Sequence, residues 1–565
     1  MGRSIQTYQV LRMSTKKPAD TSPRTAEVSR RELMASGAAV ASAMLAATAT
    51  TAQAASRALP GHATGKAPRA PFDSIRDWVA ALDHHGLLLR FSGIDQDAYD
   101  ATAIVYQLID EFGVHGAPAV LFEDIKANGR AFPGPVVANL QGHMDTEALI
   151  WGIEPDARDA KQSYRAAKEL MLERLEQTEG NYTLIEPHEV AADEAPVKQI
   201  RLTGDDIDVM AFPFFRGNPG DGGPYINTAS VFTQDVDMGV NFGTYRCQVK
   251  GPRKIMVNFE TGQTGWKMVQ AAKERGETSI KVTLVIGQDP VTWMVSSSRI
   301  PSRLGSRDPI DELAVAGGLR GKAIDVVRTE DGEFLVPAHA EIVIEGTVDI
   351  VNLEPEGPYH EMYGYMGIKK EKNYVMRIDT LTHRKDPWIM NSFTGMISEY
   401  VKAPQTAANI YSLRKSSPQV VDYYSPNDSQ GLVYISIRKD APGQAIEIAK
   451  PLAMFNPLAR VTIVVDDDID VMDSAAVRFA IGSRWQPATA TEIFENRRAF
   501  PLDPAAPDRK TTSKIIIDAT RQWPEEGGPP FYQELNRTLF ENAAPDAIER
   551  VIARWPDQLL AKRRF

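Results

Sequence analysis

The feature that most constrains the fold is a change of residue pattern in the middle of the chain. Between about residues 189 and 382, short apolar runs alternate with turns rich in Gly, Pro and Asp. Runs of this length separated by such turns are typical of the strands of a barrel. The regions before and after instead mix amphipathic helices with short apolar strands. We therefore predict a multidomain α/β protein with a β-barrel-like domain in the middle.

Apolar runs and helical periodicity predict the individual elements. In the middle region we expect strands at 197–202, 255–259, 280–286 and 341–346, and a helix at about 309–319. In the N-terminal region we expect a helix that opens at 72–78 with Asp73 or Ser74 as its N-cap, a strand at 119–122 and a helix at 164–177. In the C-terminal region the continuous apolar run 461–465 predicts a parallel strand covered on both faces, with helices at 443–453 and 474–482.

The first residues carry a targeting pattern rather than a fold pattern. Arg30 and Arg31 precede an uncharged, Ala-rich stretch that ends in Ala52-Gln53-Ala54, a small-x-small cleavage pattern. This arrangement is typical of a twin-arginine export signal, and it predicts export to the periplasm or cell exterior with a cofactor already loaded in the cytoplasm. A single membrane anchor is the weaker alternative, because Ala and Thr are poorly hydrophobic.

The predicted domain bounds follow from these changes of pattern. We expect a signal peptide at 1–55, a linker at 56–70, an N-terminal α/β domain at 71–187, a β-barrel domain at 188–382, a C-terminal α/β domain at 383–545 and a tail helix at 546–565.

Charge and cysteine content exclude several classes of function. The 565 residues carry a net charge of −11, and no dense Lys/Arg cluster is present, which argues against a nucleic-acid surface. The single cysteine, Cys247, excludes an intrachain disulfide and a Cys-rich zinc site. We expect it to be a buried, inert thiol.

Two short segments carry residues with a chemical use. Residues 241–246 offer an amide, Asn241, and a guanidinium, Arg246; residues 356–361 offer two carboxylates, Glu356 and Glu361, on either side of a Gly-Pro turn. An arginine between two carboxylates can hold one ionised while the other keeps its proton. Together the segments predict a general acid beside a site for a substrate carboxylate.

Six segments follow one another in the order and spacing of UbiD-type decarboxylases, which this chain resembles over residues 72–523. They are 219–223 (Pro-Gly-Asp-Gly-Gly), 241–246, 311–317 with Glu312, 336–346, 356–361 and 513–520. The resemblance implies a central split β-barrel that binds prenylated FMN. It also implies reversible, non-oxidative decarboxylation of an aromatic, heteroaromatic or α,β-unsaturated acid through a covalent adduct with that cofactor.

The resemblance also implies roles for the paired segments. Arg246 would orient the substrate carboxylate and pair with Glu356. Glu361 would deliver the proton, its pKa raised by burial and by its like-charged neighbour. The alternative is an ion-pair network with a purely structural role.

A divalent metal and a potassium ion are implied beside the cofactor phosphate. The family holds the metal with Asn, His and Glu; Asn241 and Glu312 match the first and third positions. No histidine lies between His188 and His339, and the nearest equivalent is Gln263, whose oxygen Mn2+ or Mg2+ can accept.

Residues 296–301 resemble the family's phosphate and potassium loop, and Lys514 resembles its flavin-contacting lysine. The loop residues that we assign to the cofactor are Ser296, Ser297, Ser298, Arg299 and Pro301. An ordinary Ser-rich turn and a solvated lysine are the alternatives.

The expected partners are a small aryl or heteroaryl carboxylate, a flavin prenyltransferase that supplies the cofactor, and further copies of the chain in a homodimer or larger assembly. Two other functions stay open: a flavin oxidoreductase on the same barrel, and an exported flavin-binding protein without turnover. The acidic run 466–470, which follows an apolar strand, is expected to be a solvated loop rather than a metal site.

Overall fold

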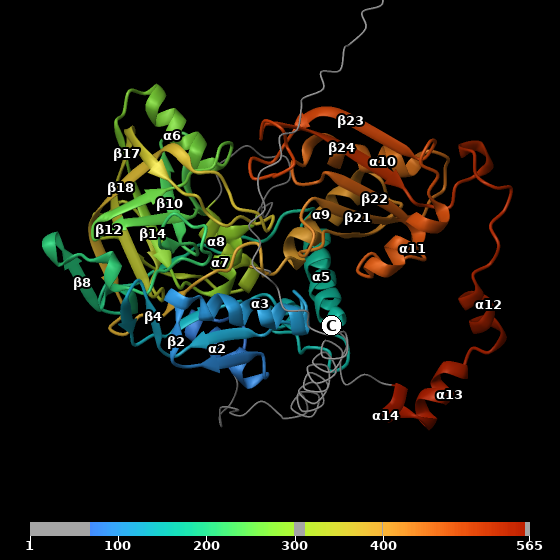
Figure 1. The fold of residues 1–565 in the computed structure, drawn as a ribbon, viewed down its shortest axis with the longest axis horizontal. Coiled ribbons are helices and arrows are strands. Elements are labelled where there is room, and N and C mark those ends of the chain that lie inside the picture. Colours follow the sequence, from blue (N-terminus) through green and yellow to red (C-terminus); the bar gives the residue numbers. More distant parts are fainter. Residues whose placement is uncertain (1–67, 299–310, 398, 560–565) are drawn as a thin grey trace, which may run out of the picture. The chain divides into compact units, whose positions relative to one another are not determined.

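The computed structural model describes residues 68–298, 311–397 and 399–559. They form a mixed α/β protein with several sheets, as predicted (Figure 1). The predicted twin-arginine signal at 1–55, most of the predicted linker, Arg299 and Pro301 lie outside the described residues. No helix within the described ranges is long and apolar enough to span a membrane.

The N-terminal part is built on two small sheets, with strand orders β1-β3-β6-β19 and β2-β4-β5. The strands are β1 (Leu88–Phe91), β2 (Ile94–Asp95), β3 (Ala119–Phe122), β4 (Ile125–Ala127), β5 (Arg130–Phe132), β6 (Val136–Ala138) and β19 (Ile389–Met390). The helices are α2 (Ile75–His84), α3 (Asp100–Phe112), α4 (Met144–Leu149) and α5 (Ala160–Gln177). Strand β19 comes from beyond the middle region, so the chain returns to the first sheet before it enters the C-terminal part.

Helix α2 begins at Ile75, later than residue 72, where the sequence pattern placed the opening of the first helix. Ser74 is the N-cap, and its hydroxyl accepts a hydrogen bond from the backbone N–H of Asp77. Ile75, Trp78 and Leu82 then lie on the buried face at helical spacing. The Ser74 alternative is therefore the correct one.

The middle part is one long sheet with the strand order β11-β10-β14-β17-β18-β13-β12-β9, to which β8 adds by pairing with β18. Its strands are β8 (Ile200–Thr203), β9 (Tyr225–Ile226), β10 (Ser230–Asp235), β11 (Gly239–Thr244), β12 (Cys247–Gly251), β13 (Lys254–Val257), β14 (Ser279–Ile286), β17 (Ile342–Glu356) and β18 (Lys370–His383). Three short strands, β7 (His188–Glu189), β15 (Asp325–Arg328) and β16 (Leu335–Pro337), form a separate small sheet.

This long sheet must curl back on itself. Strands β11 and β12 lie near opposite ends of the strand order, yet only Tyr245 and Arg246 separate them in sequence. No ladder joins the two end strands in the described part of the chain, so the sheet is open there and the split-barrel detail stays a prediction. The curl places Arg246 where the two edges of the sheet approach each other.

Two predicted strands of the middle part are confirmed, and each pairs with a neighbouring strand on both sides. A third is wrong in the half that follows a proline. The predicted strands at 255–259 and 280–286 correspond to β13 and β14. The predicted strand at 197–202 is wrong in its first half, because Pro196 opens a 3-10 turn over Pro196–Lys198 and pairing with β18 starts only at Ile200. The predicted strand at 341–346 is only the beginning of β17, which continues to Glu356.

Three helices accompany the long sheet: α6 (Thr264–Glu274), α7 (Pro290–Ser297) and α8 (Glu312–Arg320). Each carries a candidate residue near one of its ends: Gln263 is the N-cap of α6, Ser296 lies in the last turn of α7, and Glu312 is the first residue of α8. The predicted helix at 309–319 is confirmed for its described part.

The C-terminal part is a five-stranded sheet covered on both faces (Figure 1). Its strand order is β20-β21-β22-β24-β23, with β22 (Val461–Asp466) parallel to both β21 (Leu432–Ile437) and β24 (Thr511–Asp518). Val464 faces a cluster with α9 (Ala403–Ser416) and α10 (Gln444–Phe455), whereas Ile463 and Val465 face a cluster with α11 (Ser474–Arg484). The prediction of a parallel strand covered on both faces is confirmed.

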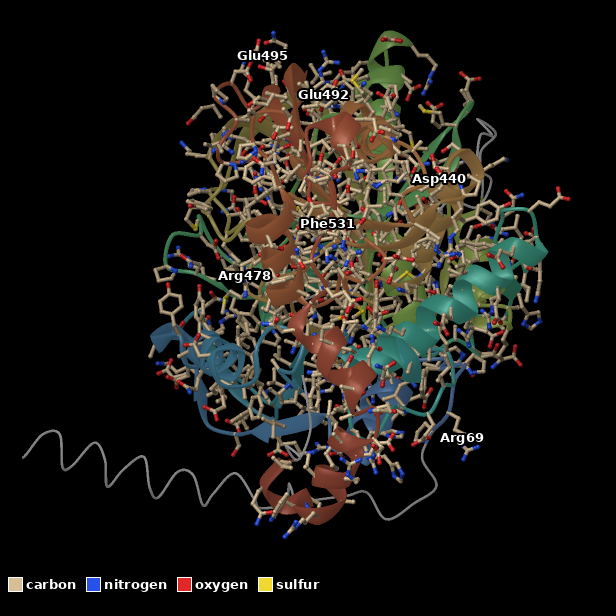
Figure 2. The ribbon with its side chains drawn as sticks, turned by 90° about the vertical axis from the view of Figure 1, so that its right-hand side faces the viewer. Arg69, Asp440, Arg478, Glu492, Glu495 and Phe531 are labelled. Carbon is tan, nitrogen blue, oxygen red and sulfur yellow. The ribbon has the colours of Figure 1, made fainter. Side chains whose placement is uncertain are left out.

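The edge strand β23 (Thr491–Arg498) is charged, and β20 (Val420–Tyr424) forms the other edge. In the view of Figure 2, Glu492 and Glu495 mark β23 and Arg478 marks α11. Charged side chains along an edge strand oppose pairing with another chain. The last described helices are α12 (Asn536–Ala543), α13 (Ala547–Arg554) and α14 (Pro556–Leu559).

Two predictions about individual residues can be compared with the structure. Cys247 is buried and burial raises the pKa of its thiol, which supports an inert thiol. The acidic run after β22 is not simply solvated: Asp466 and Asp468 both pair with the buried Arg484. The predicted domain bounds stay predictions.

Candidate active site

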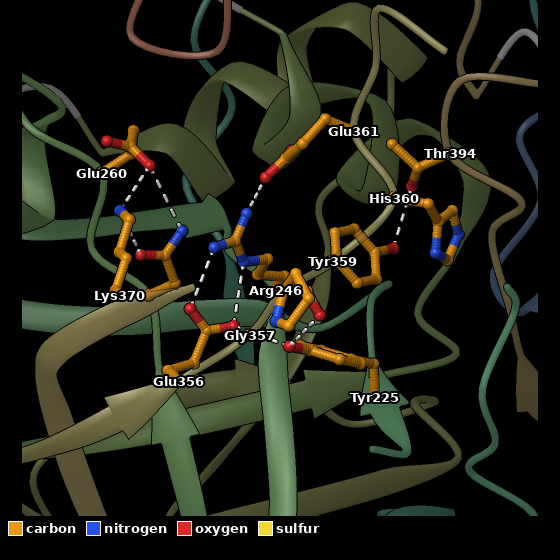
Figure 3. Close-up of polar contacts among 12 residues, drawn as sticks. Tyr225, Arg246, Glu260, Glu356, Gly357, Tyr359, His360, Glu361, Lys370 and Thr394 are labelled. Atoms are coloured by element: carbon orange, nitrogen blue, oxygen red, sulfur yellow. Dashed lines mark hydrogen bonds and ion pairs between the residues drawn. The ribbon is translucent and has the colours of Figure 1, made fainter. Parts of the chain in front are cut away.

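Arg246 joins the two segments that the sequence singled out (Figure 3). Its guanidinium donates from Nε to Glu356 Oε1 over 3.1 Å and from Nη2 to Glu356 Oε2 over 2.9 Å. Its Nη1 contacts Glu361 Oε1 on the other side. The three residues are 8%, 0% and 5% exposed respectively, so the predicted arginine between two carboxylates is a buried cluster.

Glu356 is surrounded by donors. Besides the two bonds from Arg246, it accepts one from the Tyr225 hydroxyl at 2.9 Å and one from Asn373 Nδ2 at 3.2 Å. Burial and the nearby Glu356 charge raise the pKa of Tyr225, which keeps its hydroxyl a donor. Burial lowers the pKa of Arg246, but the bonds and charge of Glu356 raise it above its ordinary value overall. Glu356 and Arg246 therefore form a fully bonded ion pair.

Glu361 has a different environment. Among the described residues, Arg246 is the only side chain that hydrogen-bonds its carboxylate, compared with three for Glu356. Gly367 packs so closely that a Cβ there would lie 2.8 Å from Glu361 Oε1. The geometry thus gives the two carboxylates different partners: three side chains bond Glu356, whereas Arg246 bonds Glu361.

The turn between the two carboxylates is held by residues to which the sequence analysis gave no role. Asp221 accepts bonds from the backbone N–H of His360 at 3.0 Å and lies 2.9 Å from His360 Nδ1. The Gly357 N–H donates to Gln248 at 3.1 Å, and the Tyr359 ring lies 5.5 Å from the Arg246 guanidinium. Asp221 lies in the Pro-Gly-Asp-Gly-Gly segment and was within reach of sequence reasoning. Tyr225, Gln248 and Asn373 carried no signal that separates them from core residues.

The second half of the site lies along β11 and the two helix N-termini. Glu312 Oε2 accepts a bond from the Phe242 N–H at 2.7 Å, which brings α8 next to Asn241. Glu312 is partly exposed as a residue, but its carboxyl is enclosed, and this burial raises its pKa to about 8. The Gly265 N–H of α6 donates to Tyr245 at 3.2 Å, so Gln263 lies at the N-terminus of a helix that contacts the same segment.

The donor chemistry of this half fits a hard divalent cation. Gln263 Oε1 is buried and has no hydrogen-bond partner within the described ranges. An orphaned amide oxygen, a second amide at Asn241 and an enclosed carboxyl at Glu312 are oxygen ligands that Mn2+ or Mg2+ accepts. A cation would satisfy the orphaned oxygen and would favour the ionised form of Glu312. No hydrogen bond joins Gln263 to Asn241 or Glu312 among the residues described.

The Ser-rich loop is only partly brought to the site. Thr244, two residues before Arg246, lies 3.0 Å from the hydroxyls of both Ser296 and Ser297. Ser298 instead donates to the carbonyl of Met294 at 2.7 Å. The remaining loop candidates, Arg299 and Pro301, lie outside the described residues.

Lys514 stands apart from the other candidates. It lies in β24, where its Nζ donates to the Asn456 carbonyl at 2.5 Å. Burial, with a smaller effect of Arg497, lowers its pKa to about 8. None of its described contacts reaches the cluster around Arg246.

Comparisons with known proteins show the family to which this chain belongs. Residues 188–397 match the family described as the 3-octaprenyl-4-hydroxybenzoate carboxy-lyase Rift-related domain, and residues 400–519 match the corresponding C-terminal domain. An uncharacterised protein of Aeropyrum pernix is 33% identical over 363 residues, which are 63% of this chain and 72% of that protein. The chain belongs to the UbiD family of carboxy-lyases.

Solved structures with the same fold include decarboxylases. The vanillic acid decarboxylase of Sedimentibacter hydroxybenzoicus, in an open form, is 25% identical, with 85% of this chain and 99% of that chain covered and a TM-score of 0.70. The UbiD-class enzyme HmfF of Pelotomaculum thermopropionicum, in complex with FMN, is also 25% identical, with 82% and 97% covered and a TM-score of 0.67. An evolved dimeric form of HmfF carries prFMN, with 25% identity, 84% and 100% coverage and a TM-score of 0.66.

Proposed function

We propose that this chain catalyses the reversible, non-oxidative decarboxylation of an aromatic, heteroaromatic or α,β-unsaturated carboxylic acid with prenylated FMN. The observation that carries the proposal is the buried cluster in which Arg246 is bonded twice to Glu356 and once to Glu361. The related HmfF structures with FMN and prFMN support the choice of cofactor.

The chemistry requires more than side chains can supply. Loss of CO2 from an sp2 carbon leaves an unstabilised carbanion, and the prenylated flavin, when bound, supplies the electron sink. What remains for the protein is to hold the carboxylate, to exclude water and to deliver a proton to the carbon that CO2 leaves.

Arg246 and Glu356 form the carboxylate-binding part. The two bonds from Glu356 fix the plane of the guanidinium and keep it cationic, while Nη1 faces Glu361. A substrate carboxylate that binds Arg246 competes with Glu361 for this donor. Glu361, released from the arginine in a buried site, then favours its protonated form.

Glu361 is the proton donor in this scheme. After CO2 has left, its proton passes to the substrate carbon, and in the carboxylation direction it accepts the proton back. The separate environments of Glu356 and Glu361 give the two carboxylates different tasks, as two environments do in other acid–base sites.

The second half of the site would hold the cofactor phosphate. We propose that Asn241, Gln263 and Glu312 bind Mn2+ or Mg2+, and that Ser296 and its neighbours bind K+, so that the phosphate dianion is neutralised. A glutamine in place of imidazole favours hard cations over softer ones.

We also propose that a flavin prenyltransferase supplies the cofactor, that the chain forms a homodimer or a larger assembly, and that it is exported by the twin-arginine route. Replacing Arg30 and Arg31 by lysine should retain the protein in the cytoplasm. Unchanged export of that variant would refute the route.

The test of function uses protein co-produced with a flavin prenyltransferase. Native mass and absorption spectra should report a prenylated flavin, and a panel of aryl, heteroaryl and α,β-unsaturated acids should include at least one that releases CO2. Unmodified FMN with electron transfer and no CO2 from any acid would favour the flavin oxidoreductase instead.

A further inference from the structure

We propose that the ion pair between Lys370 and Glu260 is a bridge that positions both halves of the active site: Glu356 on the substrate side and Gln263 on the metal side. Neither residue contacts Arg246 through a hydrogen bond, so both act through other residues (Figure 3). The contacts of the bridge do not depend on the proposed function, whereas its expected effect on the active site rests on that function.

On the substrate side the bridge reaches Glu356 through two amides. Lys370 Nζ donates to Asn258 Oδ1 at 2.8 Å, and the same oxygen accepts a bond from Asn373 Nδ2 at 3.0 Å. Asn373 in turn donates to Glu356 at 3.2 Å. Glu356 and Lys370 also face each other across β17 and β18. Lys370 thus fixes which way the Asn258 amide points, and through it the donor that Asn373 offers to Glu356.

On the metal side the bridge reaches Gln263 through the turn before α6. Lys370 Nζ donates to Glu260 Oε2 at 2.7 Å. The other carboxylate oxygen of Glu260 accepts the Thr261 N–H at 3.2 Å, and the Glu260 carbonyl accepts the Gln263 N–H at 3.1 Å. These bonds close the turn that places Gln263 as the N-cap of α6.

Low solvent exposure distinguishes the Lys370–Glu260 pair from a surface salt bridge. The Lys370 side chain is 25% exposed and that of Glu260 is 11% exposed, so screening by solvent is weak. Burial raises the pKa of Glu260, but Lys370 and Arg246 together lower it below its ordinary value. Without Lys370, Glu260 would be a third carboxylate competing for the charge of Arg246, and the turn at 260–263 would lose its fixed partner.

The chain offers a matched control. Lys254 and Glu354 form another Lys–Glu pair between β13 and β17, at 2.6 Å, with side chains 41% and 45% exposed. This pair lies on the same sheet, and in the described structure its side chains hydrogen-bond neither Asn258 nor Asn373, although Glu354 faces Asn373 across β17 and β18. Lys254→Met therefore removes a more exposed Lys–Glu pair of the same sheet without removing any hydrogen bond of the bridge.

Hydrogen–deuterium exchange of the full chain tests the bridge without cofactor or turnover. Lys370→Met should speed exchange about tenfold in both 258–265 and 356–361, Lys370→Arg should restore protection, and Lys254→Met should leave both segments within about twofold of wild type. Exchange unchanged in either segment would overturn the proposal. Should Lys370→Met not fold, Glu260→Gln, which keeps the shape and removes the charge, is read by the same criterion.

The flavin-loaded enzyme gives a second readout. Titration with Mn2+ followed by electron paramagnetic resonance should show about tenfold weaker binding in Lys370→Met and wild-type binding in Lys254→Met. Equal affinity in wild type and Lys370→Met overturns the bridge. A wild-type enzyme that binds no Mn2+ contradicts the proposed metal site instead, and the exchange experiment still decides the bridge.

Discussion

The two halves of the site differ in how completely the oxygen atoms of their carboxylate and amide side chains are satisfied. On the substrate side, Glu356 accepts bonds from three side chains and Arg246 donates to two carboxylates. On the metal side, Gln263 Oε1 has no partner among the described residues, and burial raises the pKa of Glu312 to about 8. Buried polar atoms are nearly always paired. The difference teaches that protein donors satisfy the Glu356 carboxylate of the first half, whereas the second half leaves an amide oxygen for the divalent metal that we propose there.

Glu361→Gln should have the largest effect on activity. Glutamine keeps the shape of Glu361 and its contact with Arg246 but has no carboxyl proton to give. We expect flavin and metal to stay bound and turnover to fall by about 10²–10⁴-fold, the usual contribution of a general acid. Single-turnover CO2 release at saturating substrate measures it. Normal turnover would remove Glu361 from the proton-donor role.

Arg246→Ala should have the largest effect on stability. It leaves Glu356, which is fully buried, without its charged partner, and breaking a buried pair in this way costs about 3–5 kcal/mol. Chemical denaturation measures this loss. Arg328→Ala is the matched control, because Arg328 also binds a glutamate, Glu189, through two bonds but is largely exposed; its loss should cost at most about 1 kcal/mol. Equal losses in the two variants would show that the Arg246 cluster is not a buried ion pair.

Tyr225→Phe should weaken the substrate half of the site without removing its ion pair. The variant removes one neutral donor from Glu356 and keeps Arg246 and Asn373, so we expect about 1–3 kcal/mol lower stability. Binding of an unreactive aryl carboxylate should change less than in Arg246→Ala. If Tyr225→Phe abolishes carboxylate binding altogether, Tyr225 itself belongs to the substrate site.

The pH dependence of Mn2+ binding should test the proposed metal-binding half of the site. Because the pKa of Glu312 is raised to about 8, its proton competes with the metal below that pH. The Mn2+ affinity should therefore fall about tenfold for each unit by which the pH is lowered below about 8. In metal-free protein the sign for stability is the opposite: the raised pKa contributes stability that is full below about pH 4.5 and is lost as pH rises through 8. Titrations between pH 6.5 and 8.5 with wild type and Glu312→Gln measure both the Mn2+ affinity and the free energy of unfolding. A slope that persists in Glu312→Gln would assign the proton to another group.

Much of the fold could be predicted from local pattern. The strand at 119–122 and the covered strand at 461–465 were predictable because their apolar runs are short, continuous and bounded by turns. The second half of β17 was not, because its sequence from Asp349 to Glu356 is rich in acidic residues and contains Pro355. Its strand geometry comes from pairing with β18, which is a long-range contact.

The same limit applies to the site. Arg246, Glu356 and Glu361 could be singled out because two carboxylates lie on either side of a Gly-Pro turn and because their segments follow the order of a known family. Asn373 and Lys370 were not, because their roles arise only when β18 lies against β17 and β13. The exact partner of Lys514 was also unpredictable, since its contact with the Asn456 carbonyl comes from a segment about sixty residues away.

The most direct test of the contrast between the two halves is the number of Mn2+ ions bound per flavin-loaded chain. Native mass spectrometry should find one ion in wild type and in Glu361→Gln, and none in Gln263→Leu at the same Mn2+ concentration. Gln263→Leu that keeps its Mn2+, or Glu361→Gln that loses it, would contradict the proposed division of the site into a substrate half and a metal-binding half.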